Sequence, residues 1–333
     1  MLEQNPFINE NNRLRSFWRA LVYFTFAYVA LGVSVVLIYA ILYGFLGKPR
    51  ADGFLGGVGG FALQGTLTFG GTLVIGWLCG KLLEKLPLKA LGWNAHAGWL
   101  PDLVFGALIG MASLLLAAAI GSAGGAKWQF NLSAAPGPVL KTLVISAVAF
   151  IWFAAAEEIA FRGYALQTMT RAGYAWAGIL LTSVPFALAH LGNPNVSLFF
   201  TFTNTTLAGV WLGLAYWKTR SLWFPLGAHW AWNWTMGSLI GLPVSGITEI
   251  APAPLFRTEL FGPSWLTGGS YGLEGGLACT LALIVSTLFI WRTRLVKASD
   301  EMLAFDEINR QNRTYAKTKE SNAETQRRGD AEQ

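Results

Sequence analysis

Charged residues are scarce in this sequence of 333 residues, because Lys, Arg, Asp and Glu together make up only 13% of it. A soluble globular protein carries about 25% charged residues. Hydrophobic residues make up 53% of the chain, and they include 15 Trp and 22 Phe. So few charges cannot cover a soluble domain this apolar, so the composition argues against a soluble protein and favours a membrane protein.

Cysteine and histidine are also scarce, with two and three residues respectively. Cys79 and Cys279 both lie in hydrophobic runs, where we expect buried, reduced thiols. Two such cysteines provide neither a disulfide framework nor a cysteine-based metal site. The basic residues are scattered along loops and form no patch, which argues against a nucleic-acid partner.

Long hydrophobic runs are abundant. Eight of them approach the ~20 residues that a helix needs to span a bilayer: 21–46, 56–80, 102–122, 139–161, 175–192, 197–217, 222–241 and 276–296. The Gly, Ser and Thr residues within them allow helices to approach closely in lipid. The predicted fold class is all-α, a polytopic membrane protein with about eight transmembrane helices.

Basic residues in the short loops predict the orientation of these helices, since Lys and Arg favour the cytoplasmic side. Twelve lie on one side: Arg13, Arg15, Arg19, Lys81, Lys85, Lys89, Arg171, Lys218, Arg220, Arg292, Arg294 and Lys297. Five lie on the other: Lys48, Arg50, Lys127, Lys141 and Arg257. We therefore expect both termini in the cytoplasm and a multi-pass protein of the cell inner membrane. The first run is too long for a signal peptide and should remain as an anchor.

The chain divides into three parts by composition. Residues 1–20 form a cytoplasmic N-terminal lead, and residues 21–297 form the transmembrane domain. Within that domain, 242–275 is a loop rich in Gly and Pro, which we interpret as a connector rather than a lid. Residues 298–333 are polar, and such a tail cannot bury enough apolar surface to fold alone, so we expect it to be disordered.

Ionisable residues are concentrated in the fourth to seventh runs, residues 138–241. The acidic residues there are Glu157 and Glu158, and the histidines are His190 and His229. A charge at the bilayer centre costs roughly 2.5–3.5 kcal/mol, so an ionisable residue in a membrane helix is a candidate for function.

Spacing separates the two glutamates. Glu158 and Arg162 are four residues apart and lie on one helix face, where they can pair. Glu157 lies about 100° round the helix, so its carboxylate points elsewhere. The alternative is that all three charges form an ion-pair cluster that ties helices together.

Two further pairs share the four-residue spacing, namely Phe186 with His190 and His229 with Asn233. Each pair alone fits a hydrogen-bonded core histidine or interhelical contacts. Together with Glu157 they suggest a converging site. A carboxylate and an imidazole can activate water, while a second His and an Asn can stabilise an oxyanion.

Two histidines and a glutamate are also the ligand set of a catalytic zinc site, so Glu157, His190 and His229 are alternatively ligands of a divalent metal such as zinc. The H-E-x-x-H pattern is absent, so such ligands would come from separate helices. No Ser-His-Asp set is apparent, because 138–241 contains no Asp.

The three motifs E-E-x-x-x-R, F-x-x-x-H and H-x-x-x-N occur in this order on successive hydrophobic runs. They resemble those of the CPBP intramembrane proteases, which include type II CAAX prenyl endopeptidases and bacterial proteins linked to bacteriocin processing or self-immunity. The resemblance covers about 138–241 and implies a helical membrane fold with a four-helix catalytic core and a cavity open to cytosol and bilayer.

The resemblance also implies roles. Glu157 would be the general base, His190 would help to activate water, and His229 with Asn233 would form the oxyanion site. Glu158, Arg162 and Phe186 would support them. The implied substrate is a lipidated or membrane-embedded peptide or protein. The alternatives are a non-catalytic scaffold or immunity protein of the same fold, and an ion pathway that uses the same residues.

Helix lengths leave one mismatch. At 1.5 Å per residue, Glu157 lies about 24 Å along its helix from Lys141, in the cytoplasmic half, whereas His190 lies about 22 Å into a helix that starts near 175. Either the fifth helix begins later, near Gly178, and is tilted, or the cavity is deep.

Overall fold

The computed structural model describes residues 5–9 and 13–305, and across these ranges the fold is all-α apart from one short strand pair. The main helices are α1 (Ser16–Leu46), α2 (Lys48–Leu55), α3 (Val58–Cys79), α4 (Trp99–Ala123), α5 (Pro136–Glu158), α6 (Ala165–Arg171), α7 (Ala175–His190), α8 (Leu198–Thr219), α9 (Trp223–Trp234) and α11 (Leu277–Arg292). Three π-helical turns extend them: η1 (Gly80–Glu84), η3 (Ile159–Gly163) and η4 (Thr235–Leu239). The shorter elements are η2 (Leu88–Leu91), α10 (Ser264–Thr267), η5 (Gly269–Tyr271) and η6 (Leu273–Gly275).

Every predicted hydrophobic run contains a helix. Five helical stretches are long and apolar enough to cross a membrane: Ser16–Leu46, Gly59–Glu84, Trp99–Ala123, Pro136–Arg171 and Leu198–Thr219. The helices α7 and α11 are apolar but shorter. These spans confirm a polytopic membrane protein.

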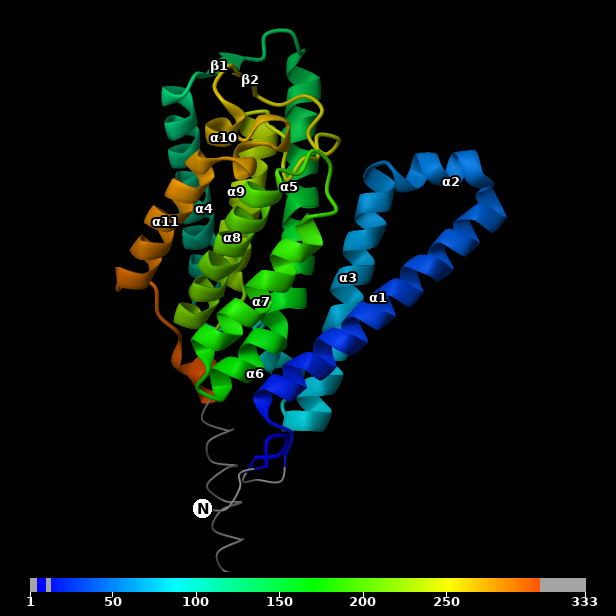
Figure 1. Ribbon diagram of the computed structural model, residues 1–333, viewed down its shortest axis with the longest axis vertical. Coiled ribbons are helices and arrows are strands. Elements are labelled where there is room, and N and C mark those ends of the chain that lie inside the picture. The colour runs from blue at the N-terminus through cyan, green and yellow to red at the C-terminus, as the bar shows by residue number, and fades with distance from the viewer. Residues whose placement is uncertain (1–4, 10–12, 306–333) are drawn as a thin grey trace, which may run out of the picture.

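The helices form a bundle with an arm at its side (Figure 1). The bundle contains α4, α5, α7, α8, α9 and α11, and the arm contains α1, α2 and α3. The arm joins the bundle where α1 packs on α6 and α3 packs on α5. The two long arm helices diverge from the bundle toward α2 (Figure 1).

Close packing of α9 on α4 fixes the position of α9 at the bundle centre. A Cβ on Gly106 or Gly110 of α4 would lie 2.1 Å from a backbone oxygen of α9, and one on Gly227 of α9 would lie 2.0 Å from the carbonyl oxygen of Leu103. Only glycine permits such an approach, which is how helices associate closely in lipid. His229 is therefore carried on a helix whose backbone has little room to shift.

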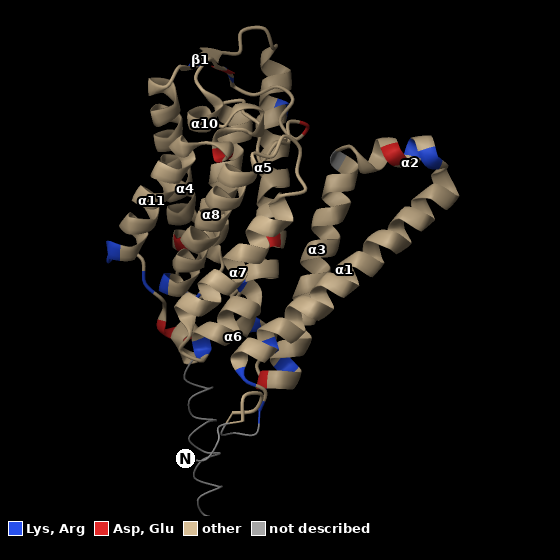
Figure 2. Ribbon diagram, viewed as in Figure 1, with Lys and Arg blue, Asp and Glu red and all other residues tan. Residues whose placement is uncertain are grey.

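Charged side chains gather mainly at the end of the molecule that contains α6 and the start of α1 (Figure 2). The first turn of α1 and the last described residues lie at this same end (Figure 1). This arrangement agrees with an even number of crossings, while the predicted cytoplasmic placement of both termini stays a prediction.

The opposite end holds the loop predicted as a connector. Part of this loop forms strand β2 (Phe256–Leu260). It pairs antiparallel with β1 (Ala126–Phe130), the strand that follows α4 and its turn. Glu274 in the same loop accepts hydrogen bonds from Trp232 of α9 at 3.0 Å and from the Ser245 hydroxyl at 2.7 Å. The loop is thus an ordered cap that is bonded to the bundle.

The predicted C-terminal tail begins with an ordered contact. Ser299 Oγ lies 3.3 Å from His96 Nδ1, Asn94 donates a hydrogen bond to Glu301, and Met302 is buried. Residues 299–302 pack because Met302 is apolar and because Asn94 and His96 offer polar partners. This part of the chain therefore differs from the prediction of a disordered tail from 298 onward. Residues 306–333 of the predicted tail, and 1–4 and 10–12 of the predicted lead, lie outside the described residues.

Candidate active site

The two glutamates lie at the end of α5, well inside a longer helical stretch. Turn η3 follows Glu158 directly and leads through Tyr164 into α6, so the stretch continues to Arg171. Glu157 is therefore about 21 Å along the helix from Arg171. His190 lies about 22 Å from the start of α7 at Ala175, so the two residues reach similar depth. The deep alternative for the cavity fits this arrangement, and α7 does not begin late.

Glu158 is a shared hydrogen-bond acceptor in the protein interior. Its Oε1 accepts from Arg162 Nη1 at 3.0 Å and from His229 Nδ1 at 2.8 Å. Both members of the Glu158–Arg162 pair are fully buried. Arg162 also donates from Nη2 to the carbonyl oxygen of Gly209 in α8, at 3.5 Å. These contacts join α5, α8 and α9.

Glu157 faces both histidines without contacting either of them closely. Its Oε2 lies 3.6 Å from His229 Nε2 and 4.0 Å from His190 Nε2. These separations exceed the usual 2.7–3.2 Å of a hydrogen bond. The Glu157 side chain is 32% exposed, although Oε2 itself is buried and has no hydrogen-bond partner within the described part of the chain. Buried carboxylate oxygens nearly always bind a donor, so this atom is poised to accept one.

The Nδ1 atoms of the two histidines each have a hydrogen-bond acceptor. His190 Nδ1 lies 2.8 Å from the carbonyl oxygen of Phe186, which can only accept, so Nδ1 carries the proton. His229 Nδ1 lies against the Glu158 carboxylate and likewise donates. Each ring is oriented through Nδ1 and presents Nε2 toward Glu157, which is how a second partner fixes the reactive nitrogen of a histidine.

Phe186 packs at the centre of this cluster and is buried. Its ring meets the rings of His190, His229 and Phe161 edge to face, with centroid separations of 4.6, 6.1 and 5.2 Å. The Arg162 guanidinium carbon lies 4.5 Å from the Phe186 ring centroid, within range of a cation–π contact. Phe186 therefore packs against Arg162 and both histidine rings, and it restricts how far those rings can turn.

Asn233 lies one turn beyond His229 on α9 and is half-buried. Between residues 13 and 305, the structure gathers the other six predicted site residues into one contact cluster but shows no hydrogen bond from Asn233 to any of them. The four-residue spacing places Asn233 on the same face of α9 as His229.

The metal alternative concerns the Glu157, His190 and His229 side chains. In the described ranges there is no group of three or more His, Cys, Asp or Glu side chains arranged to hold a metal ion. Glu157, His190 and His229 supply donor atoms of the types that zinc binds, and Glu157 Oε2 lies 3.6 and 4.0 Å from the two histidine Nε2 atoms. Metal binding by these three residues stays a prediction.

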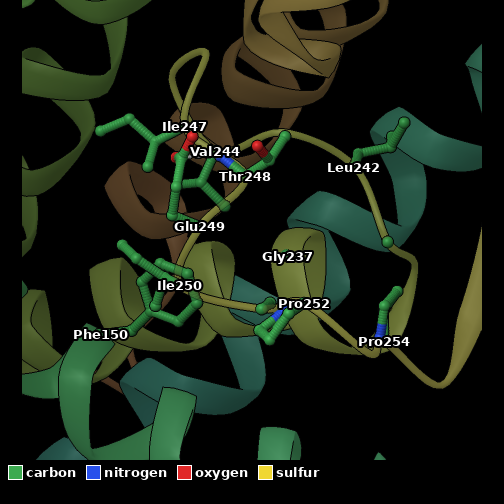
Figure 3. Close-up of a pocket in the computed structure, with 12 residues that line it drawn as sticks. Phe150, Gly237, Leu242, Val244, Ile247, Thr248, Glu249, Ile250, Pro252 and Pro254 are labelled. Carbon is green, nitrogen blue, oxygen red and sulfur yellow. Dashed lines mark hydrogen bonds between the residues drawn. The ribbon is translucent and has the colours of Figure 1, made fainter. Parts of the chain in front are cut away.

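A pocket of about 390 Å³ lies elsewhere, between Phe150 of α5, Gly237 of η4 and the loop 241–254 (Figure 3). None of the seven predicted site residues lines it. Phe150 is about 10 Å along α5 from Glu157. The Glu157–histidine cluster and this pocket are therefore separate features, although α5 and the α9–η4 helix contribute to both.

Sequence reasoning missed a second buried charge cluster. Glu84 Oε1 lies 3.0 Å from Arg19 Nη1, and Glu84 Oε2 lies 3.0 Å from Arg171 Nη2, with all three side chains almost fully buried. The sequence pattern places Arg19 and Arg171 in loops. The available signal was Glu84, an acidic residue between Lys81 and Lys85 at the end of an apolar run, where a partner is needed.

Comparison with known families bears on these residues. Residues 138–235 match the family model described as type II CAAX prenyl endopeptidase Rce1-like. Over this segment the chain is similar to that family of prenyl endopeptidases. The match runs from α5 to the start of η4 and contains all seven predicted site residues, so the resemblance found in the sequence is confirmed.

No curated protein matches the chain, and no solved structure matches it either. The match points to a protease, and the apolar helices indicate a lipid bilayer environment. The arm α1–α3, helix α4 and helix α11 lie outside the matched segment.

Proposed function

We propose that this protein is an intramembrane endopeptidase that hydrolyses a peptide bond near the C-terminus of a prenylated or otherwise membrane-embedded protein. The main support is the approach of two histidine Nε2 atoms to one Glu157 oxygen, at 3.6 and 4.0 Å. This arrangement lies inside the segment that matches the protease family.

Glu157 acts as the general base in this proposal. Separations of 3.6–4.0 Å suit a single water that bridges the groups. Glu157 accepts a proton from the water while the water oxygen attacks the scissile carbonyl carbon, and His190 Nε2 accepts the second hydrogen bond of that water. The proton then passes from Glu157 to the leaving amide nitrogen as the C–N bond breaks. The new carboxylic acid releases the second proton of the water, so the products are a carboxylate and an amine.

His229 and Asn233 stabilise the tetrahedral intermediate. The negative oxygen that develops on the carbonyl needs preorganised donors in a site with little water. Asn233 donates from its side-chain amide, and His229 in its protonated form donates from Nε2. Glu158 contributes by holding His229 Nδ1 at 2.8 Å, which keeps Nε2 directed toward the reacting atoms.

The substrate class rests on the family and on the membrane. A prenylated C-terminal peptide carries its own lipid anchor, so it reaches a site within the bilayer by lateral diffusion. An unmodified membrane peptide is the second substrate type, and the two are separated by comparing a farnesylated C-a-a-X peptide with its unprenylated form.

The test uses the full-length protein in proteoliposomes with an internally quenched farnesylated C-a-a-X peptide. Glu157→Gln keeps the side-chain shape but removes the base, so we expect cleavage to fall by about 10²–10⁴-fold. Glu259→Gln makes the same chemical change on an exposed position of β2 and should leave cleavage unchanged. Equal cleavage by wild type and Glu157→Gln would refute the proposed mechanism.

A non-catalytic scaffold or immunity protein of the same fold is the second candidate. The observation in its favour is that Glu158, Arg162 and His229 already tie three helices together. In that case wild type would show no Glu157-dependent cleavage, and cells that carry Glu157→Gln would keep the wild-type phenotype. Glu157-dependent ion flux in liposomes would instead indicate an ion pathway.

A further inference from the structure

The active-site helix is interrupted directly after the glutamates. Turn η3 (Ile159–Gly163) is π-helical, and it separates Glu158 from α6 while containing Arg162. A wide turn of this kind changes the rotation of the residues that follow it and commonly occurs at functional sites. The direction in which Arg162 meets Glu158 therefore depends on η3 keeping its π-helical form.

A π-turn leaves backbone carbonyl groups without their usual α-helical partners, and buried carbonyl groups need a donor. Two side chains supply donors here. Tyr23 of α1 donates its hydroxyl to the carbonyl oxygen of Ala160 at 2.8 Å, and Gln167 of α6 donates from Nε2 to that of Arg162 at 3.2 Å.

Tyr23 is unusual among the residues of α1. The most apolar stretch of this helix is not buried against the protein, whereas Tyr23 is fully buried. It lies on a narrow buried stripe with Arg19, Ala20 and Ala27. Its ring packs 5.6 Å from the ring of Tyr164, the residue after η3. The hydroxyl is thus held at the turn by the burial of Tyr23 and by the packing of its ring on Tyr164.

We infer that Tyr23 is a positioning residue for the active site, acting through η3 on the Arg162–Glu158 pair and hence on His229. The helix that carries it lies outside the segment matched by the family model. The arm of this protein is therefore part of the apparatus that orders the site and is not only an anchor. This inference rests on the proposed endopeptidase function.

The test compares two conservative substitutions on the same helix. Tyr23→Phe removes only the hydroxyl, which donates to the η3 carbonyl oxygens of Ala160 at 2.8 Å and Ile159 at 3.4 Å. Tyr43→Phe is the matched control, because its hydroxyl bonds to Asp52 at 2.8 Å, at the far end of α1. With the farnesylated C-a-a-X peptide in proteoliposomes, we expect kcat of Tyr23→Phe to fall about tenfold, the loss that corresponds to one unmet buried hydrogen bond. The KM should stay unchanged, and Tyr43→Phe should keep the wild-type kcat.

Rescue separates positioning from general loss of structure. A para-aminophenylalanine at position 23 retains a donor at the same place, so it should restore kcat to near the wild-type value. If the phenylalanine variant does not fold, the para-aminophenylalanine variant still allows kcat to be measured with a donor at position 23. The inference is overturned if Tyr23→Phe and Tyr43→Phe have equal kcat, if only KM changes, or if the amino analogue stays as slow as phenylalanine.

The result also distinguishes this inference from the proposed function. Cleavage that needs Glu157 but does not respond to Tyr23→Phe overturns the inference and leaves the function standing. Cleavage that does not need Glu157 overturns the function and the inference together.

Discussion

Replacing Arg162 by Met should strongly destabilise the protein. The substitution removes the cation from a fully buried ion pair while keeping most of the side-chain volume. It leaves Glu158 with His229 Nδ1 as its remaining partner. It also removes the bond from Arg162 to the Gly209 carbonyl and the contact with the Phe186 ring.

The size of the effect follows from the geometry. At the observed separation of 3.0 Å, two unit charges in an effective dielectric of ~20 attract by about 5.5 kcal/mol. Removing one partner of a buried pair typically costs about 3–5 kcal/mol, because the other charge stays buried. We therefore expect the free energy of unfolding of Arg162→Met to fall by about 3–5 kcal/mol.

A second substitution should recover much of that loss. Adding Glu158→Gln removes the stranded charge, while the side-chain oxygen still accepts from His229 Nδ1. Unfolding by SDS in mixed micelles, followed by tryptophan fluorescence, measures all variants, with Arg292→Met as the control because Arg292 is exposed at the end of α11. The reasoning is refuted if Arg162→Met is as stable as the control, or if Glu158→Gln lowers the stability further.

The remaining predictions concern packing. Gly227→Ala should destabilise the protein by about 1–3 kcal/mol, because its Cβ would lie 2.0 Å from the carbonyl oxygen of Leu103. Gly70→Ala is the control and should not destabilise the protein, because nothing lies within 4 Å of its Cβ. Equal unfolding free energies of the two variants would contradict the tight α4–α9 contact. Cys79 and Cys279 are buried, so neither should react with a maleimide in the folded protein and both should react after denaturation, as measured by mass spectrometry. Fast labelling of either thiol in the folded state would contradict its burial.

Local spacing predicted the parts of the site that depend on one helix. The four-residue interval placed Arg162 on the Glu158 face, and the 100° offset directed Glu157 to a different set of partners, as the structure shows. Hydrophobic length likewise predicted every main helix of the bundle. These features follow from the geometry of a single helix and need no knowledge of its neighbours.

Features set by contacts between helices escaped prediction. The spacing of Glu84 to Arg19 and Arg171 along the chain carries no periodic signal, so the sequence alone places the two buried arginines in loops. No residue pattern in the sequence marks the π-turn after Glu158. This turn joins α5 to α6, so Glu157 lies deeper in the helical stretch than the predicted hydrophobic run 139–161 suggested. Both depend on tertiary packing, which overrides local preference.

Single-turnover cleavage of the farnesylated peptide in H₂¹⁸O tests the central claim most directly. If Glu157 activates water for direct attack, mass spectrometry should find one ¹⁸O atom in the new carboxylate of the product and none in the Glu157 side chain. Glu157→Gln should release almost no labelled product. Label in the Glu157 carboxylate would show that this residue attacks the substrate itself, and labelled product at the wild-type rate from Glu157→Gln would show that the chemistry occurs elsewhere.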